Sequence, residues 1–168
     1  DQLGLSPECM IYDLSNACLG VMSSILTSAK LIESGLIKNA LIVSGENGGP
    51  LIFNTIEQLN KSTTITRKNI KKYIANLTIG SAAVAVSISG EKNERTPHQL
   101  IAGAGLCDSS AHNLCHGDGN THSIMMETDS EAMLKKGIAL SKETMNHTLE
   151  TLNWNRNDFD YVVGHQVG

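Results

Sequence analysis

The spacing of apolar residues predicts strands alternating with a helix at the start of the chain. Residues 8–14 form a short apolar run after a Ser-Pro turn, which is typical of a buried strand. In residues 19–33 the apolar side chains recur at three- and four-residue steps, as on one face of a helix, and Gly35 supplies its end. Residues 39–44 predict a second buried strand. This order predicts a βαβ unit whose strands are parallel and covered on both faces.

Further strands are predicted by runs of small, apolar or β-branched residues. Residues 80–88 have the small and β-branched side chains of a strand. A polar turn over residues 90–97 leads into another strand at residues 99–102. A last strand is predicted at residues 161–163, directly before His165.

Between these strands lie a long irregular segment and a long helix. Residues 103–123 are rich in Gly, His, Ser and Asn without periodicity, and because such loops are uncommon unless functional, we expect this one to border a site. Thr128, followed three residues later by Glu131, fits a capping box at a helix start. A stripe of apolar residues at helical spacing then predicts a long amphipathic helix. The stripe comprises Leu134, Ile138, Met145, Leu149 and Leu152.

Composition indicates a globular protein and argues against polyanionic partners. Hydrophobic residues make up 40% and charged residues 18% of the chain, unlike a disordered protein. The net charge is −4, so nucleic acid and anionic lipid are not expected partners, and the short basic runs at residues 67–68 and 71–72 read as solvated helix faces. The sequence contains neither an apolar run that could span a bilayer nor a signal peptide, so a cytoplasmic location is expected.

Length and ends predict a piece of a longer protein, and the cysteines predict free thiols. The 168 residues suit one domain, but the chain starts at Asp1 without an initiator Met and stops at Gly168, just after a strand-like run. The four cysteines have no Cys-x-x-Cys spacing, so neither a zinc ribbon nor a redox dithiol is indicated.

Cys18 is the first candidate for chemistry. It follows the predicted strand at residues 8–14 and begins the predicted helix, with Ala17 and Gly20 leaving room beside the sulfur. A thiol at a helix N-terminus faces unpaired N–H groups and the positive end of the helix dipole, which stabilise thiolate over thiol. The alternative is an inert buried cysteine, which is common in proteins.

His165 is the second candidate. It follows an apolar strand-like run, so it is expected at the carboxyl edge of a sheet, where sites of sheet proteins gather. A structural histidine is the alternative. The combination of Cys-x-Gly after one strand with Gly-His-Gln after another favours chemistry.

These motifs resemble those of a known family. Residues 13–20, Asp-Leu-Ser-Asn-Ala-Cys-Leu-Gly, resemble the nucleophile motif of the ketoacyl synthase III group in the thiolase superfamily, and residues 163–166, Val-Gly-His-Gln, resemble its histidine motif. Residues 80–86 resemble the Gly-rich strand that closes that family's first half. Within the group, four motifs look most like the bacterial acyl-CoA condensing enzyme of long-chain olefin synthesis: residues 15–20, 112–116, 127–130 and 165–168.

The resemblance implies a fold and an assembly. The fold is α/β, the five-layered αβαβα sandwich of two similar halves known as the thiolase fold, and it is expected to be incomplete in this chain. Residues 1–90 would be the latter part of the N-terminal half, which carries the nucleophile. Residues 91–168 would begin the C-terminal half and end after the His-Gln motif. A homodimer is implied for the intact protein.

The resemblance also implies roles. Cys18 would take an acyl group from a thioester, and its backbone N–H would contribute to an oxyanion hole. His165 would donate a hydrogen bond to the thioester oxygen of the second substrate. The family's Asn partner of this histidine and its Gly-rich oxyanion turn are expected beyond Gly168.

A Claisen condensation that yields a β-ketoacyl product is therefore predicted. The substrates would be acyl-CoA or acyl carrier protein thioesters, and no other cofactor is expected. Since the sequence lacks a basic patch for a carrier protein, two acyl-CoA molecules are slightly favoured over decarboxylative synthesis on a malonyl carrier protein. The alternative from another class is an inactive thiolase-fold binding protein.

Three other groups of residues could also carry chemistry. A cluster of Cys, His and Asp residues in the predicted loop could supply zinc ligands, but the spacings between them do not match the usual two-plus-two pattern of zinc ligands, so no metal site is predicted. The cluster comprises Cys107, His112, Cys115, His116, Asp118 and His122. Through the resemblance the same loop would line the acyl or pantetheine channel. His98-Gln99 repeats the catalytic dipeptide by coincidence, and Glu46 is expected to be a buried structural carboxylate near the site.

Overall fold

The computed structural model describes residues 3–91, 97–117 and 125–165. The chain divides into two compact units, of which the first comprises Asp1–Gly45 with Ala83–His98 and the second Glu46–Ala82 with Gln99–Gly168. These units reflect contacts within this chain, so the predicted division into thiolase halves near residue 90 stays a prediction.

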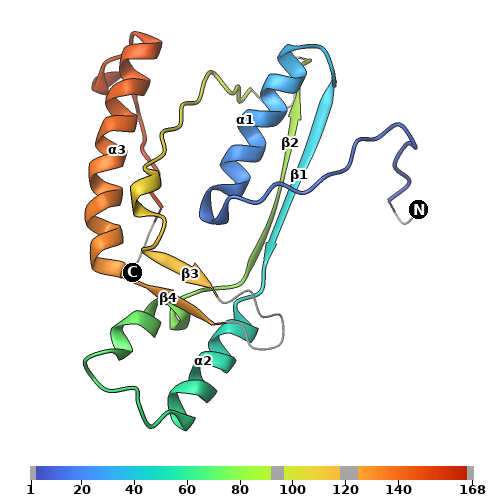
Figure 1. Ribbon diagram of the computed structural model, residues 1–168. Coiled ribbons are helices and arrows are strands. Elements are labelled where there is room, and N and C mark those ends of the chain that lie inside the picture. The colour runs from blue at the N-terminus through green and yellow to red at the C-terminus, as the bar shows by residue number, and fades with distance from the viewer. Residues whose placement is uncertain (1–2, 92–96, 118–124, 166–168) are drawn as a thin grey trace. The chain divides into compact units, whose positions relative to one another are not determined.

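The first unit is a helix beside a pair of strands (Figure 1). A 3-10 turn, Ala17–Leu19, leads into α1, Gly20–Glu33. The strands β1, Asn39–Glu46, and β2, Ala82–Ser89, are neighbours and run in opposite directions (Figure 1). The predicted helix and two of the predicted strands are thus confirmed, whereas the expected parallel βαβ unit is not formed among the described residues.

Strand β1 alternates between a covered and an open face. Ile42 is buried, while its neighbours Leu41 and Val43 on the other face are 64% and 70% exposed. Since successive side chains of a strand point to opposite faces, one face of β1 is covered and the other presents apolar side chains to solvent.

The end of α1 explains the glycine that the sequence singles out. Gly35 has φ +75°, a left-handed conformation that favours glycine. Its N–H donates to the carbonyl of Ile32 at 2.9 Å, and that of Leu36 donates to the carbonyl of Leu31 at 3.0 Å. These two bonds form a Schellman motif, which satisfies carbonyls left open at the helix end. The predicted stop is confirmed.

The second unit contains three further helical segments of note and a short strand pair (Figure 1). They are α2, Gly49–Lys61; the 3-10 helix Ile70–Leu77; α3, Ser130–Leu152; and strands β3, Cys115–Gly117, and β4, Met126–Thr128. The short 3-10 turns Ser109–Ala111 and Arg156–Asp158 complete it. β3 and β4 are antiparallel, and His116 lies opposite Glu127.

A buried polar pair joins these elements. Asn76 donates through Nδ2 to the Thr55 hydroxyl at 3.1 Å and to the Met126 carbonyl at 2.9 Å. These bonds link α2, the 3-10 helix Ile70–Leu77 and β4. The Nδ2 group of this buried amide is bonded twice, whereas its Oδ1 has no hydrogen-bond partner among the described residues, so the two bonds from Nδ2 are what hold the three elements relative to one another.

The start of α3 corrects the predicted cap. Asp129, not Thr128, is the N-cap, since its carboxylate accepts from the Ala132 N–H at 3.0 Å. Thr128 is instead the buried last residue of β4. The long helix itself is confirmed, one residue later than the capping-box pattern places it.

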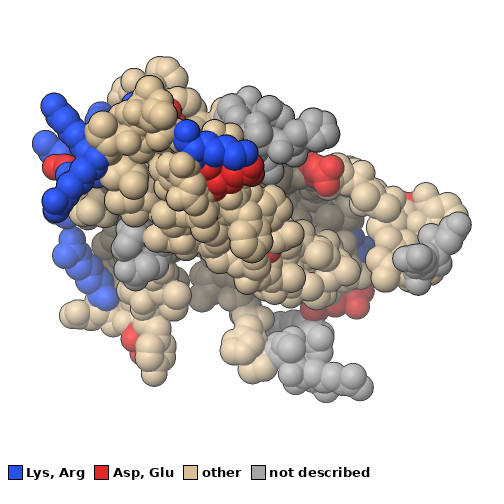
Figure 2. Space-filling model, turned by 90° about the horizontal axis from the view of Figure 1, so that it is seen from below, with Lys and Arg blue, Asp and Glu red and all other residues tan. Residues whose placement is uncertain are grey.

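Basic residues lie on the surface, as expected. Residues 67–68 and 71–72 are exposed. Figure 2 shows Lys and Arg side chains on the surface of the visible face, some of them beside acidic side chains. Lys72 is one paired basic residue: its Nζ lies 3.2 Å from the Glu127 carboxylate.

Three predicted strands are absent from the described residues. Residues 8–14, 99–102 and 161–163 have no regular structure, and their apolar side chains, such as Ile11, Ile101 and Val163, are exposed. A strand exists only when a neighbour accepts and donates its backbone hydrogen bonds, and no described strand pairs with these segments.

The segment after β2 departs from expectation in a second way. The predicted loop at residues 103–123 contains β3 and the turn Ser109–Ala111. Residues 92–96 of the predicted turn, and residues 118–123 of the predicted loop, lie outside the described residues.

Candidate active site

The turn that carries Cys18 has an unusual backbone. Ala17 has φ +42°, in the left-handed region that a residue with a Cβ rarely adopts. The Leu19 N–H donates to the carbonyl of Asn16 at 2.9 Å, and the Gly20 N–H donates to that of Ala17. A tight turn is therefore built directly onto α1. Strained backbone of this kind persists only where surrounding bonds hold it, and it is frequent at functional sites.

One side-chain hydrogen bond ties this turn to α1, and a second lies within the first turn of α1 itself. Asn16 Nδ2 donates to Ser23 Oγ at 2.8 Å, and Ser24 Oγ donates to the Gly20 carbonyl at 2.8 Å. Cys18 lies between these anchors and is an exposed free cysteine. The sequence prediction of a cysteine at a helix start is thus confirmed, although the preceding segment is not a strand.

A cavity of about 250 Å³ lies against the same turn. It is lined by the chain before α1, the first turn of α1 and the middle of β1. Most of its polar lining consists of short side chains, Asp13, Ser15, Asn16, Ser24 and Ser44. Cys18 is not among the lining residues, so the cavity borders the turn, and the exposed cysteine is not part of its wall.

His165 is exposed and follows the irregular residues 161–164. The expected strand before it is absent, and the Gln166 of its motif lies outside the described residues. Cys18 belongs to the first compact unit and His165 to the second. Their joint action stays a prediction.

Glu46 corrects an expectation. It ends β1 and is exposed, so it is not the buried structural carboxylate that the sequence suggested. Alternation places Glu46 on the same face of β1 as the buried Ile42, but as the last residue of the strand it is exposed.

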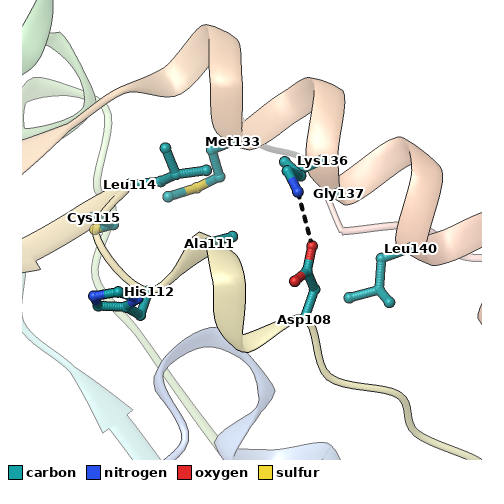
Figure 3. A pocket seen from close by; sticks show the side chains of 9 residues that line it. All are labelled: Asp108, Ala111, His112, Leu114, Cys115, Met133, Lys136, Gly137 and Leu140. Atoms are coloured by element: carbon teal, nitrogen blue, oxygen red, sulfur yellow. Dashed lines mark hydrogen bonds and ion pairs between the residues drawn. The ribbon is translucent and has the colours of Figure 1, made fainter.

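A second cavity, of about 220 Å³, lies between α3 and the segment that precedes β3 (Figure 3). Its apolar wall includes Leu114, Met133 and Leu140. Lys136 and Asp108 point toward one another across it, with 3.2 Å between Nζ and Oδ2. Hydrogen bonds from Ser110 and then Lys136 hold the pKa of Asp108 below its ordinary value.

The cysteines and histidines of this segment do not converge on a metal site. His112 Nδ1 lies 3.1 Å from the Ser109 carbonyl oxygen, and Cys115 Sγ lies 3.5 Å from the Thr128 hydroxyl. Asp118 and His122 lie outside the described residues. Within the part of the chain that the structure describes, no three Cys, His, Asp or Glu side chains are grouped to hold a metal ion.

With this geometry in hand, comparison with known proteins identifies the family. Residues 12–103, which include the Cys18 turn, match the family model of 3-Oxoacyl-[acyl-carrier-protein (ACP)] synthase III. The chain belongs to this synthase III family.

Within the synthase III family, the chain is similar to proteins named for acyl-CoA. It is 38% identical to the Acyl-CoA:acyl-CoA alkyltransferase of Shewanella oneidensis, with 99% of this chain and 49% of that protein covered. A crystal structure of a Glu-to-Ala variant of Xanthomonas campestris OleA has a TM-score of 0.85 at 30% identity, covering 99% of this chain and 47% of that one. A Cys-to-Ser variant of the same protein, with bound lauric acid and lauroyl-CoA, has a TM-score of 0.81 at 28% identity, with 95% and 46% covered.

These matches settle the fold class. The synthase III chain has the α/β thiolase fold, incomplete here, as the sequence motifs predicted. It spans about half the length of the curated relatives it matches. A search of its described helices finds none that combines the length and the apolar character needed to cross a bilayer.

One contact at the site was missed by sequence reasoning. The Asn16–Ser23 hydrogen bond joins residues seven apart, of which Asn16 precedes the 3-10 turn Ala17–Leu19 and Ser23 lies in the first turn of α1. A polar pair at this spacing, one member before the helix and one inside it, was the signal that could have revealed the contact.

Proposed function

We propose that Cys18 is the acyl-accepting nucleophile of an acyltransferase that condenses two acyl-CoA molecules into a β-ketoacyl product. The observation that carries this proposal is the turn at Cys18: an exposed cysteine at the start of α1, next to an Ala17 with positive φ. Membership of the synthase III family and similarity to proteins named acyl-CoA:acyl-CoA alkyltransferase support it.

The first step is acyl transfer. The Cys18 thiolate attacks the thioester carbonyl of an acyl-CoA, a new S–C bond forms, and the CoA thiolate leaves. The Leu19 and Gly20 N–H groups already donate to the carbonyls of Asn16 and Ala17, so the oxyanion of the tetrahedral intermediate is assigned to the backbone N–H of Cys18 itself. The exposure of Cys18 suits entry of a thioester.

The second step forms the carbon–carbon bond. A second acyl-CoA loses an α-proton to a base, its enolate attacks the acyl-Cys carbonyl, and the Cys18 thiolate is released. His165 donates a hydrogen bond to the thioester oxygen on which the enolate charge develops. This role requires the two compact units to bring both residues to one substrate in the intact protein.

The remaining assignments belong to the same proposal. The enzyme uses no cofactor besides its thioester substrates, works in the cytoplasm and forms a homodimer. The segment at residues 103–123 contributes to the acyl or pantetheine channel; the cavity beside Leu114, Met133 and Leu140 supports this because its wall is largely apolar.

The test is mass spectrometry of the full-length protein after incubation with lauroyl-CoA. We expect one lauroyl group on Cys18 and none in Cys18→Ala. Cys115→Ser is the matched control, because Cys115 is also an exposed free cysteine and should keep the adduct on Cys18. A protein that takes up no acyl group would contradict the proposal and favour a thiolase-fold binding protein.

The family name itself supports a second candidate, a decarboxylative 3-oxoacyl synthase that condenses acyl-Cys18 with a malonyl carrier protein. Product analysis separates the two. With lauroyl-CoA alone, the first predicts a β-ketoacyl product of two lauroyl units and the second predicts none. A product that appears only when malonyl carrier protein is added would replace the first candidate with the second.

A further inference from the structure

We propose that Asn16 and Ser23 act together as a latch that positions the Cys18 turn, so that both are positioning residues for acyl transfer. The inference rests on the proposed function of Cys18. It adds that two side chains that do not react hold the backbone turn of Cys18 in its orientation. Its basis is the 2.8 Å hydrogen bond from Asn16 Nδ2 to Ser23 Oγ.

The turn needs an anchor because its backbone is strained. Ala17 has φ +42°, and Asn16 before it has φ −150° and ψ 45°, outside the regular helix and strand regions. Such a conformation relaxes unless neighbouring bonds hold it. The backbone bonds within residues 16–20 are local and could persist in a turn of different orientation, so they do not fix its direction relative to α1.

The Asn16 side chain supplies that fixed direction. It reaches over the turn and bonds Ser23 within α1, seven residues further along. Cys18 lies inside the loop that this bond closes. The bond therefore sets how the Cys18 backbone N–H and thiol are presented to a substrate, without touching the substrate.

The alternative reading is that Asn16 contacts substrate or that Ser23 only supports the helix. A double-mutant cycle distinguishes these readings, because two residues that act through one bond lose the same effect when either is removed. The variants are Asn16→Ala, Ser23→Ala and the double variant, with Ser23→Thr as the conservative variant that keeps a hydroxyl.

The experiment uses the full-length protein with Cys9, Cys107 and Cys115 changed to Ser, and modification of Cys18 is followed by mass spectrometry of the peptide that contains it. Two rates are followed: alkylation of Cys18 by iodoacetamide, and acylation by lauroyl-CoA under single-turnover conditions. Ser34→Ala, at the far end of α1, is the matched control, because the Ser34 hydroxyl bonds the Leu31 carbonyl away from the turn.

We expect each single variant to lower the acylation rate by about 2- to 10-fold, the effect of one lost hydrogen bond. The half-saturating concentration of lauroyl-CoA should stay unchanged, because neither side chain binds it. The double variant should equal either single variant, and Ser23→Thr should restore the rate. Circular dichroism and thermal melting check that each variant is folded. If Asn16→Ala does not fold, the comparison of the acylation rates of Ser23→Ala and Ser23→Thr tests the latch in its place.

Two outcomes would overturn the latch. One is a double variant whose loss is the product of the two single losses; the other is a loss in Asn16→Ala with none in Ser23→Ala. Absence of any acyl adduct in the parent protein contradicts the proposed function instead, and the alkylation cycle then still decides whether the latch couples Asn16 to Ser23.

Discussion

The side-chain nitrogen of Asn76 lies 3.1 Å from the hydroxyl oxygen of Thr55, and both side chains are fully buried. Among the described residues the one buried apolar side chain is Ile42, in the first unit, and it is buried less completely than these two. The second compact unit is therefore centred on a hydrogen-bonded polar pair. Such pairs are costly to break, because the partner left behind keeps its desolvation penalty.

Thr55→Val tests this dependence. Valine keeps the shape of threonine but removes the acceptor of Asn76, so we expect a loss of about 1–3 kcal/mol in the free energy of unfolding. Urea denaturation measures it. Thr151→Val is the matched control: the Thr151 hydroxyl bonds the His147 carbonyl on the exposed side of α3, and its loss should cost less than about 0.5 kcal/mol. Equal costs would mean that the buried pair is not a centre of stability.

A second prediction concerns pH. The carboxylate of Glu127 accepts from Lys72 at 3.2 Å and from Tyr73 at 3.1 Å, and it lies opposite His116 in the strand pair. The bond from Lys72 holds the pKa of Glu127 below its ordinary value of 4.5, against partial burial. Burial, then the bond to Glu127, raises the pKa of Tyr73 above 10.0.

The two shifts act at opposite ends of the pH range. Because the folded pKa of Glu127 is lowered, its contribution is present above pH 4.5 and is lost as the pH falls through the folded pKa. Because the folded pKa of Tyr73 is raised, its contribution is present below pH 10.0 and is lost as the pH rises through the folded pKa. We expect Glu127→Gln to flatten the acid limb of stability against pH, and Tyr73→Phe to flatten the alkaline limb.

The same pair permits a direct titration. In Glu127→Gln the pKa of Tyr73 should fall but stay above its ordinary value, because burial, the larger cause, remains. Ultraviolet absorbance of tyrosinate, with Tyr73→Phe subtracted to remove Tyr12 and Tyr161, measures it. An unchanged Tyr73 pKa would show that the two groups are not coupled.

The sequence alone predicted the elements whose determinants are local. Each of these elements is predicted by residues within its own segment: α1 by the period of its apolar residues, the end of α1 by Gly35, and β2 by its small and β-branched residues. The structure confirms all three elements. The Cys18 turn was likewise predicted from neighbours in the sequence and from family motifs. Its positive φ at Ala17 was not, because alanine carries no signal for that conformation.

Predictions that depend on a distant partner did not hold. Residues 8–14, 99–102 and 161–163 have the apolar character of strands, but a pattern shows that a segment favours burial and does not supply the strand that pairs with it. The Asn76–Thr55 bond joins residues 21 positions apart and has no periodic signal. The position of His165 relative to Cys18 likewise depends on contacts between residues that are far apart in the sequence.

A third prediction compares a glycine just after a helix with a glycine inside one. Gly35 has φ +75°, so Gly35→Ala should cost about 1–2 kcal/mol, the penalty of a Cβ in the left-handed region. Gly137 lies inside α3, and a Cβ there meets no atom within 4 Å. Gly137→Ala should therefore stabilise by about 0.5–1 kcal/mol. Thermal melting of both variants should show shifts of opposite sign; two shifts of the same sign would contradict this reading.

The last prediction decides between the two residues that could begin α3. Asp129 accepts the Ala132 N–H at 3.0 Å, so Asp129→Ala should lower the free energy of unfolding by about 1 kcal/mol, and Asp129→Ser should recover most of it because serine also caps. Thr128 bonds only weakly, to Cys115 Sγ at 3.5 Å, and Thr128→Val keeps its buried shape. Urea denaturation monitored by helical circular dichroism should rank Asp129→Ala as the costlier change. The reverse ranking would restore the capping box that the sequence suggested, since Thr128 would then be the residue on which the helix start depends.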